Sequence, residues 1–451
     1  MTKMNRRNFL KSSSAAAVFA ATPGLAYAQL IGGGAPFDDY RALVCVFLFG
    51  GNDSFNMLVP RSDAEYDVYQ TSRQNLAIAQ QDLLPITTPG TGATLYGMHP
   101  TMTSLQQLFE AGDATFVTNV GPLVEPTTQD DFFNKSVALP PQLFSHNDQQ
   151  DQWNSLKGNQ TSKTGWAGRM ADLIRSNVAE QQMATNASLF GNNLLQSADE
   201  TIAYVMGPGG PLQFTGFSTT PGEPGYEQRQ AFIRILEAQY GSIYERAFAE
   251  VQSRAIATAD TVTAAIESRP PPTTIFPQSQ LGEQLQTVAR LVAARDDLQM
   301  QRQVFFVAAG GFDSHDNQNL DQPGLLADIS ESLAAFYNAT VELGVSDTVT
   351  TFTQSDFGRT LTSNGDGTDH AWGGNQIVLG DAVIGGQLIG SYPELQIGGP
   401  EDVGGGRFIP STSADQYAAT LAKWFGIPDT DLDIVAPNLA NFPLRDLGFM
   451  A

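Results

Sequence analysis

Three of the four histidines in the chain lie within two positions of an aspartate. They are His146, His315 and His370, whereas His99 in the segment YGMHPTM has no acidic residue so close. Imidazole and carboxylate groups without thiolates suit Zn²⁺, Mn²⁺, Fe or Ca²⁺/Mg²⁺. A divalent ion held by such groups neutralises the oxygens of a phosphate or sulfate ester and lowers the pKa of an attacking hydroxyl. The pattern predicts a divalent metal site of open identity; the alternative is that the clusters form internal hydrogen bonds and hold no metal.

The polar clusters that contain these histidines all follow apolar runs typical of buried strands. Ligand sites in α/β sheets form beyond the carboxyl ends of the strands, so we expect the clusters to meet at one edge. Asp313 and His315, together with His370, are the firmest candidates for metal ligands. The four clusters are GGNDSFN (50–56), LFSHNDQQDQW (143–153), GGFDSHDNQ (310–318) and TQSDFGRTLTSNGDGTDHAWGG (353–374).

Two further residues are candidates for direct roles in catalysis. Ser145 precedes the predicted helix HNDQQDQW, and the free N–H groups at a helix start favour the anionic form of a hydroxyl, as a nucleophile requires. Its alternative role is that of a helix N-cap. Arg359 is the candidate for a bidentate contact with an oxyanion. Its alternative role is a structural ion pair with one of the chain's many acidic side chains.

Strand-like and helical segments alternate along most of the chain. This alternation predicts an α/β fold with a large, mostly parallel sheet sandwiched by helices. Residues 182–300 begin with an Asn-, Gly- and Pro-rich stretch and continue into helical segments. We expect them to form a helical insertion or cap on a single α/β domain.

The first 28 residues have the features of a twin-arginine signal peptide. Arg6 and Arg7 precede a short alanine-rich apolar stretch, and residues 26–28 form an A-x-A cleavage signature. The apolar stretch is too short for a permanent membrane span. We therefore expect cleavage before Gln29 and export of residues 29–451 to the periplasm or the medium.

The composition excludes several classes of function. The 451 residues carry a formal net charge of −23, which opposes binding to nucleic acid and docking on anionic lipid. We expect neither a nucleic acid partner nor an integral membrane protein. An anionic substrate requires local positive charge, which metal ions supply. Cys45 is the single cysteine, so a disulfide within the chain and a cysteine metal cluster are both excluded, and its apolar surroundings predict a core position.

An ordered set of motifs resembles the DUF1501 family of exported bacterial proteins. Besides the twin-arginine start, the set comprises FLFGGNDSFNMLVP, MHPTMTSLQQLFEAGDATFVTNVG, FSHNDQQDQW, GWAGR, GGFDSHDNQ and SDFGRTLTSNGDGTDHAWGG. The family is placed among alkaline phosphatase and sulfatase-like folds. The resemblance therefore implies that residues 29–451 form an alkaline-phosphatase-like α/β domain with a metal-assisted site at the strand ends.

The resemblance also implies roles for single residues. The superfamily's first strand ends in a metal-binding aspartate, for which Asp53 or Asn52 is the nearest substitute here. The segment Ser355–Gly358 is similar to an SDHG motif, with Phe357 in place of a metal-binding histidine. The nucleophile falls near Ser145, so the implied catalytic residues are Ser145, His146 and Arg359. The implied metal ligands are Asp53, Asp313, His315, Asp356, Asp369 and His370.

These residues favour an exported metal-assisted hydrolase whose substrate is an anionic ester of phosphate or sulfate, either a small molecule or a polymer. The alternative is an exported binding or assembly protein that keeps the fold without catalysis. No C-x-P-x-R motif occurs, which argues against a formylglycine sulfatase. An esterase with Ser54 as its nucleophile lacks the required D-x-x-H near the C-terminus, and no G-x-S-x-G elbow occurs.

Overall fold

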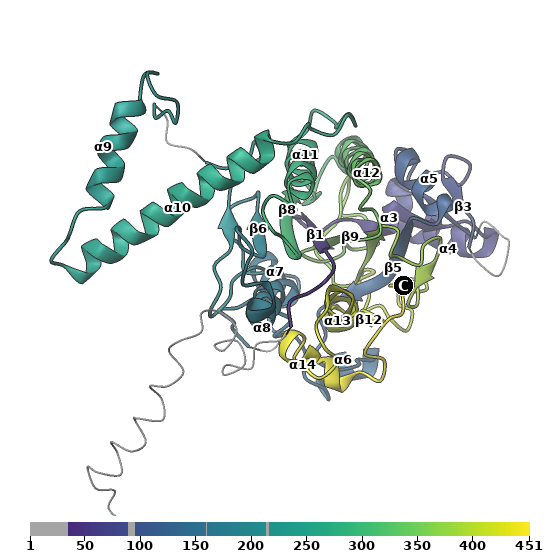
Figure 1. Ribbon diagram of the computed structural model, residues 1–451. Coiled ribbons are helices and arrows are strands. Elements are labelled where there is room, and N and C mark those ends of the chain that lie inside the picture. Colours follow the sequence, from purple (N-terminus) through teal and green to yellow (C-terminus); the bar gives the residue numbers. More distant parts are fainter. Residues whose placement is uncertain (1–34, 89–94, 159, 213–215) are drawn as a thin grey trace, which may run out of the picture.

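A nine-stranded sheet forms the centre of the molecule (Figure 1). The computed structural model describes residues 35–88, 95–158, 160–212 and 216–451. The strands of this sheet are β1 Arg41–Leu48, β5 Ala114–Gly121, β6 Asn186–Ser188, β7 Tyr204–Val205, β8 Arg302–Ala309, β9 Val349–Ser355, β10 Gly374–Leu379, β11 Leu388–Ile389 and β12 Thr412–Ser413. Their order is β11-β5-β10-β9-β1-β8-β6-β7, and β12 pairs with β5. β10 runs antiparallel to β5 and β9, whereas the other pairs are parallel, so the predicted mostly parallel sheet is confirmed.

β1 lies between β8 and β9 and is parallel to both. Its side chains alternate between two apolar layers: Val44 and Val46 belong to one, and Leu43 and Cys45 to the other. Both layers are buried, which explains why the sequence of this strand is apolar throughout rather than alternating. Cys45 is a core residue, as expected.

Helices cover both faces of the sheet, which confirms the predicted sandwich (Figure 1). Leu105, Leu285 and Leu333 bury one helical layer against the sheet, and Trp166 and Tyr417 belong to the opposite layer. The first layer contains α5 Thr103–Ala111, α11 Gln280–Ala293 and α12 Gln318–Glu342. The second contains α7 His146–Ser155, α8 Trp166–Ile174, α13 Ala414–Phe425 and α14 Leu432–Val435.

A small antiparallel sheet lies beside the main one, with strand order β2-β4-β3. Its strands are β2 Leu58–Pro60, β3 Leu84–Ile86 and β4 Tyr96–Met98. Short helices accompany it and the following loops, namely α3 Ser54–Met57, α4 Asp63–Arg73 and α6 Gln129–Asn134.

Two helices, α9 Tyr226–Leu236 and α10 Ile243–Glu267, project away from the sheet as an arm (Figure 1). They lie within residues 182–300, the range expected to form an insertion or cap. The same range also contains β6, which pairs with β8, and α11, which packs on the sheet. The part that leaves the main body therefore comprises α9 and the length of α10 before its last turns, because Val262, Ala265 and Ile266 near the end of α10 pack in the core.

Within the described residues, no helix is both long and apolar enough to cross a membrane. The predicted signal peptide, residues 1–28, lies outside the described residues.

Candidate metal centre

The loops that follow β1, β8 and β9 meet at one edge of the sheet. These strands are adjacent and parallel, so their carboxyl ends point the same way. Arg359, in the loop after β9, joins the three loops, because its Nη1 donates to the Gly50 carbonyl and to Asp313 Oδ1, each at 2.8 Å. The sequence expectation that these strand ends share one edge agrees with this arrangement.

Three residues from separate segments form a group with the chemistry of a metal site. His146, Asp313 and His370 each offer one ligand atom, and these atoms lie within 4.8 Å of one another. Asp313 bridges the two rings: its Oδ2 is 3.5 Å from His146 Nε2, and its Oδ1 is 3.4 Å from His370 Nε2. Two imidazoles and a carboxylate are a common donor set for divalent first-row metals.

His315 adds a third imidazole at the edge of this group. Its Nε2 lies 2.9 Å from His370 Nε2 and 3.0 Å from Asp313 Oδ1. The opposite nitrogen, Nδ1, is 3.4 Å from Asp369 Oδ1. Two ring nitrogens approach this closely when one donates a proton to the other or when both face a shared cation. We call His146, Asp313, His315 and His370 the histidine cluster.

Two of the rings are oriented by partners behind the cluster. His146 Nδ1 is 2.6 Å from Asp356 Oδ2, and His370 Nδ1 is 2.7 Å from the Phe144 carbonyl oxygen. A carbonyl oxygen only accepts, so His370 Nδ1 carries the proton of this bond. Neutral His370 therefore presents an unprotonated Nε2 to Asp313. Metal-bound histidines are held in the same way, by an acceptor at the second ring nitrogen.

The electrostatics keep two members of the cluster, His370 and Asp313, in the protonation state that suits a cation. Burial lowers the pKa of His370, more than the hydrogen bond to Phe144 raises it. Burial raises the pKa of Asp313, but the hydrogen bond and charge of Arg359, with smaller contributions from His315 and His146, outweigh it, and the net pKa is lowered. A neutral His370 faces an ionised Asp313 at neutral pH, and both are then free of competing protons.

The sequence from residue 40 to residue 404 matches the family described as "Protein of unknown function (DUF1501)". The chain belongs to the DUF1501 family. No curated protein matches it.

Two solved structures are distantly similar to this DUF1501 protein. Ps i-CgsB in complex with k-i-k-neocarrahexaose is 12% identical with a TM-score of 0.34, over 88% of this chain and 74% of that chain. A protein labelled BT33494S-sulf, described with the metabolism of multiple glycosaminoglycans by Bacteroides thetaiotaomicron, is 10% identical with a TM-score of 0.34, over 92% and 77%. Likeness at this level carries no conclusion about activity.

Asp53, expected among the ligands, is engaged elsewhere in this DUF1501 protein. Its carboxylate is fully buried, forms an ion pair with Arg73 and accepts a hydrogen bond from Gln318. Both oxygens are thereby occupied, and the grouped ligand atoms do not include them. The side chain of Asp53 holds the loop after β1 against α4 and α12 instead.

Asp356 lies behind the cluster rather than within its group of ligand atoms. Its Oδ2 accepts hydrogen bonds from His146 and, at 2.9 Å, from Gln150 Nε2. Its Oδ1 is buried and has no hydrogen-bond partner among the described residues. The neighbouring Phe357 packs its ring against His146 and His370, with centroid distances of 4.9 and 4.6 Å. Phe357 thus supplies an apolar wall where the resemblance implied a ligand.

The structure places the remaining sequence candidates around the cluster. Ser145 precedes α7, next to His146, and its hydroxyl donates to Asp148 Oδ2 at 2.6 Å. Asp369 faces His315 and accepts from Asn364 Nδ2 at 3.1 Å. Arg359 is fully buried and makes the structural ion pair that was its alternative role.

Two residues of the site carried no signal that we recognised in the sequence. Phe144 has a left-handed backbone, with φ of 73°, which is rare for a bulky residue and aims its carbonyl at His370. Arg407 donates from Nε to the His370 carbonyl at 2.9 Å. The three glycines before Arg407, residues 404–406, are the pattern that marks this loop in the sequence.

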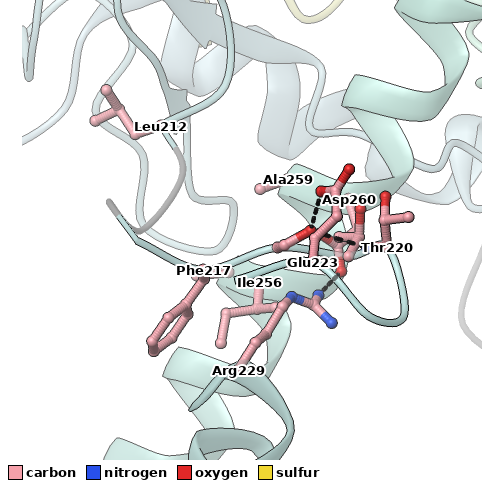
Figure 2. Close-up of a pocket in the computed structure, with 11 residues that line it drawn as sticks. Leu212, Phe217, Thr220, Glu223, Arg229, Ile256, Ala259 and Asp260 are labelled. Carbon is pink, nitrogen blue, oxygen red and sulfur yellow. Dashed lines mark hydrogen bonds and ion pairs between the residues drawn. The ribbon is translucent and has the colours of Figure 1, made fainter. Parts of the chain in front are cut away.

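A separate cavity of about 250 Å³ lies in the arm, at α10 (Figure 2). Arg229 and Asp260 form an ion pair in its wall, beside Phe217 and Ile256. None of the residues that line it belongs to the histidine cluster. We therefore assign the candidate chemistry to the sheet edge and not to this cavity.

Proposed function

We propose that this protein is a metal-dependent hydrolase of phosphate or sulfate esters. The observation that carries the proposal is the convergence of three imidazoles on Asp313, with hydrogen-bond acceptors behind two of the rings. His146, Asp313, His315 and His370 would hold the ion, and their nitrogen and oxygen donors fit Zn²⁺, Mn²⁺ or Fe. When bound, such an ion supplies positive charge to a developing oxyanion and lowers the pKa of an attacking hydroxyl or water.

The exposure of the cluster is compatible with an ester that approaches from solvent. The side chains of His146, Asp313 and His370 are 30%, 46% and 24% exposed. Side chains exposed to this degree can be reached by a small molecule or by a segment of a polymer. The net charge of −23 makes local positive charge necessary for any anionic substrate.

The residues around the proposed ion have three separate roles: they orient the ligand rings, shield them from water and supply the nucleophile. Asp356 and the Phe144 carbonyl fix the rings of His146 and His370, and Phe357 shields one side of both rings from water. Ser145 is the proposed nucleophile, because Asp148 accepts its hydroxyl proton in a hydrogen bond at the start of α7.

Metal analysis and ester hydrolysis together test the proposal. Protein purified through its native export route, which we expect to be the twin-arginine route, should contain about one divalent ion per chain. His370→Ala and Asp313→Ala should lose the ion and the activity on aryl phosphates or sulfates. His99→Gln is the matched control, because His99 bonds Thr101 and lies outside the grouped ligand atoms. A folded wild-type protein free of metal and inert to both ester classes would refute the proposal.

The nucleophile is tested separately with Ser145→Ala. Turnover should fall to background while the metal content stays at the wild-type value, because Ser145 is not among the grouped ligand atoms. Unchanged turnover would exclude Ser145 as nucleophile and leave water as the attacking group.

A non-catalytic binding protein is the second candidate. It is favoured by the engagement of Asp53 with Arg73 and by Phe357, since both reduce the number of groups available to stabilise charge. Stoichiometric metal without turnover on any ester would establish this alternative.

A further inference from the structure

Arg407 lies directly beside the histidine cluster. Its Nε donates to the His370 carbonyl at 2.9 Å, and its guanidinium carbon is 5.5 Å from the centroid of the Phe144 ring. The carbonyl of the same Phe144 accepts from His370 Nδ1. The pKa of Asp369 is lowered, mainly by its hydrogen bond from Asn364 and in part by the charge of Arg407. One guanidinium is thus fixed against the backbone of His370 and the ring of Phe144, at the border of the cluster proposed to hold the ion.

The loop that carries Arg407 is built around a buried carboxylate. Asp402 is 3% exposed, and its Oδ1 accepts from the backbone N–H groups of Gly404, Gly406 and Arg407 at 2.7, 2.8 and 3.1 Å. Gly404 and Gly406 have φ of 125° and 75°, a backbone that other residues seldom adopt. The loop therefore presents Arg407 from a rigid base.

Arg407 also keeps donors that the protein does not use. Its Nε and Nη1 donate to the carbonyls of His370 and Gly404, whereas Nη2 has no hydrogen bond to any described residue. Within the described part of the chain, no carboxylate lies within ion-pair distance of it. By contrast, Arg359 is fully buried and donates to Thr368, Gly50 and Asp313.

We infer that Arg407 is the residue that binds the oxyanion of the substrate, which is the sulfate or phosphate group of the ester. The identity of the reaction rests on the proposed function. The location of the anion site rests on the geometry of the loop that carries Arg407. A planar guanidinium binds two oxygens of a tetrahedral anion at once. Its positive charge at the cluster counteracts the net charge of −23. Arg407 thereby takes the oxyanion-binding role expected of Arg359, whose guanidinium is engaged by Asp313.

Calorimetric titration of the metal-loaded protein with inorganic phosphate and with sulfate tests the inference without turnover. Wild type should bind at least one of them, and Arg407→Gln should bind it about 10- to 100-fold more weakly, the loss expected for hydrogen bonds to a charged group. Arg407→Lys should recover part of the affinity. Arg175→Gln is the matched control, because Arg175 is an exposed arginine paired with Glu200. Metal content and thermal midpoint, measured on every variant, verify that each is folded and loaded.

The outcomes separate this inference from the proposed function. Equal affinity of wild type and Arg407→Gln, or no binding of either anion by metal-loaded wild type, would overturn the role of Arg407. Anion binding that depends on Arg407 without hydrolysis of any ester would support Arg407 and refute the hydrolase. With active enzyme, Arg407→Gln should raise KM more than it lowers kcat.

Discussion

Arg359 shows how a single side chain joins the loops of the candidate site. Its guanidinium is fully buried and bonds the loop after β1 through Gly50, the loop after β8 through Asp313, and its own loop through Thr368. Burial lowers the pKa of Arg359, although Asp313 partly counters this effect. The group remains charged at neutral pH, because the ordinary pKa of arginine is far above 7.

Removal of Arg359 should therefore destabilise the protein. Arg359→Met leaves two carbonyls and Asp313 without their donor, and we expect a loss of about 3 kcal/mol in the free energy of unfolding. Arg254→Met serves as the control, because Arg254 is 76% exposed and pairs with Glu250 one turn away. Its effect should stay below about 0.5 kcal/mol. Equal urea midpoints for the two variants would contradict the structural role of Arg359.

The types of single residues predicted the cluster but not every role within it. His146, His315 and His370 were recognisable because each has an aspartate nearby in a segment that follows a strand or opens a helix. The engagement of Asp53 was not recognisable, because its partner Arg73 reaches it only after α4 has packed. Phe144 was missed as well, since a backbone carbonyl acts here and sequence carries no mark of it.

At the scale of elements, two loops of the site pack backbone against backbone at Gly367. A Cβ on this glycine would lie 2.3 Å from the carbonyl carbon of His315 and 2.4 Å from the Ser314 oxygen. Neither atom belongs to a flexible side chain, so the loop after β8 would have to move away from the loop that carries His370.

Gly367→Ala should consequently lower the affinity for metal and, to a moderate extent, the stability of the fold. We expect an affinity loss of at least about tenfold and a destabilisation of about 1–3 kcal/mol, as for other overpacked sites. The matched control is Gly310→Ala, because no heavy atom lies within 4 Å of a Cβ placed on Gly310. Metal affinity from a competitive chelator assay should be unchanged in the control. Wild-type affinity in Gly367→Ala would show that the loops tolerate separation.

The first turn of α13 contains a buried carboxyl group that makes stability depend on pH. Burial raises the pKa of Asp415 to about 7, although hydrogen bonds from Asn438 oppose the shift. The unfolded chain releases this proton near its ordinary pKa of about 4. The stabilising contribution is complete below about pH 4 and is lost as the pH rises to about 7, by at most about 1.4 kcal/mol per pH unit.

Asp415→Asn should flatten this dependence. The free energy of unfolding of wild type minus that of the variant, measured by urea titration between pH 4.5 and pH 7.5, should decrease as the pH rises. Asp433→Asn is the control, because Asp433 is 51% exposed and pairs with Arg445 at the surface. Parallel pH profiles for wild type and Asp415→Asn would disprove the contribution of this group.

Elements were predictable from the sequence where burial imposes a simple pattern. The apolar runs at 41–48, 303–309 and 349–355 form adjacent strands, because both sides of each are covered by helices. The packing of the helices within residues 182–300 was harder to predict, because an amphipathic pattern does not indicate which surface a helix covers. α11 packs on the sheet, whereas most of α10 extends away from it and its last turns join the core, although both are helical in sequence.

At the scale of the whole molecule, a bound ion should stabilise the native state. The proposed ligands come from α7 and from the loops after β8 and β9, so the unfolded chain does not hold them together. Metal at 100 times its dissociation constant should add about 2.7 kcal/mol. Scanning calorimetry should show a higher thermal midpoint with Zn²⁺ or Mn²⁺ than with chelator, and no difference in His370→Ala. A shift of equal size in that variant would place the ion elsewhere.

The wide sequence separation of the cluster has a consequence for how the protein folds. His146, Asp313 and His370 are separated by whole strands and helices, and each must be delivered by closure of a long stretch of chain. Such contacts form slowly, because chain entropy opposes them until the intervening elements are in place. A refolding molecule would regain secondary structure early and affinity for metal late. The moment at which a refolding molecule begins to bind metal would then mark the completion of the native topology.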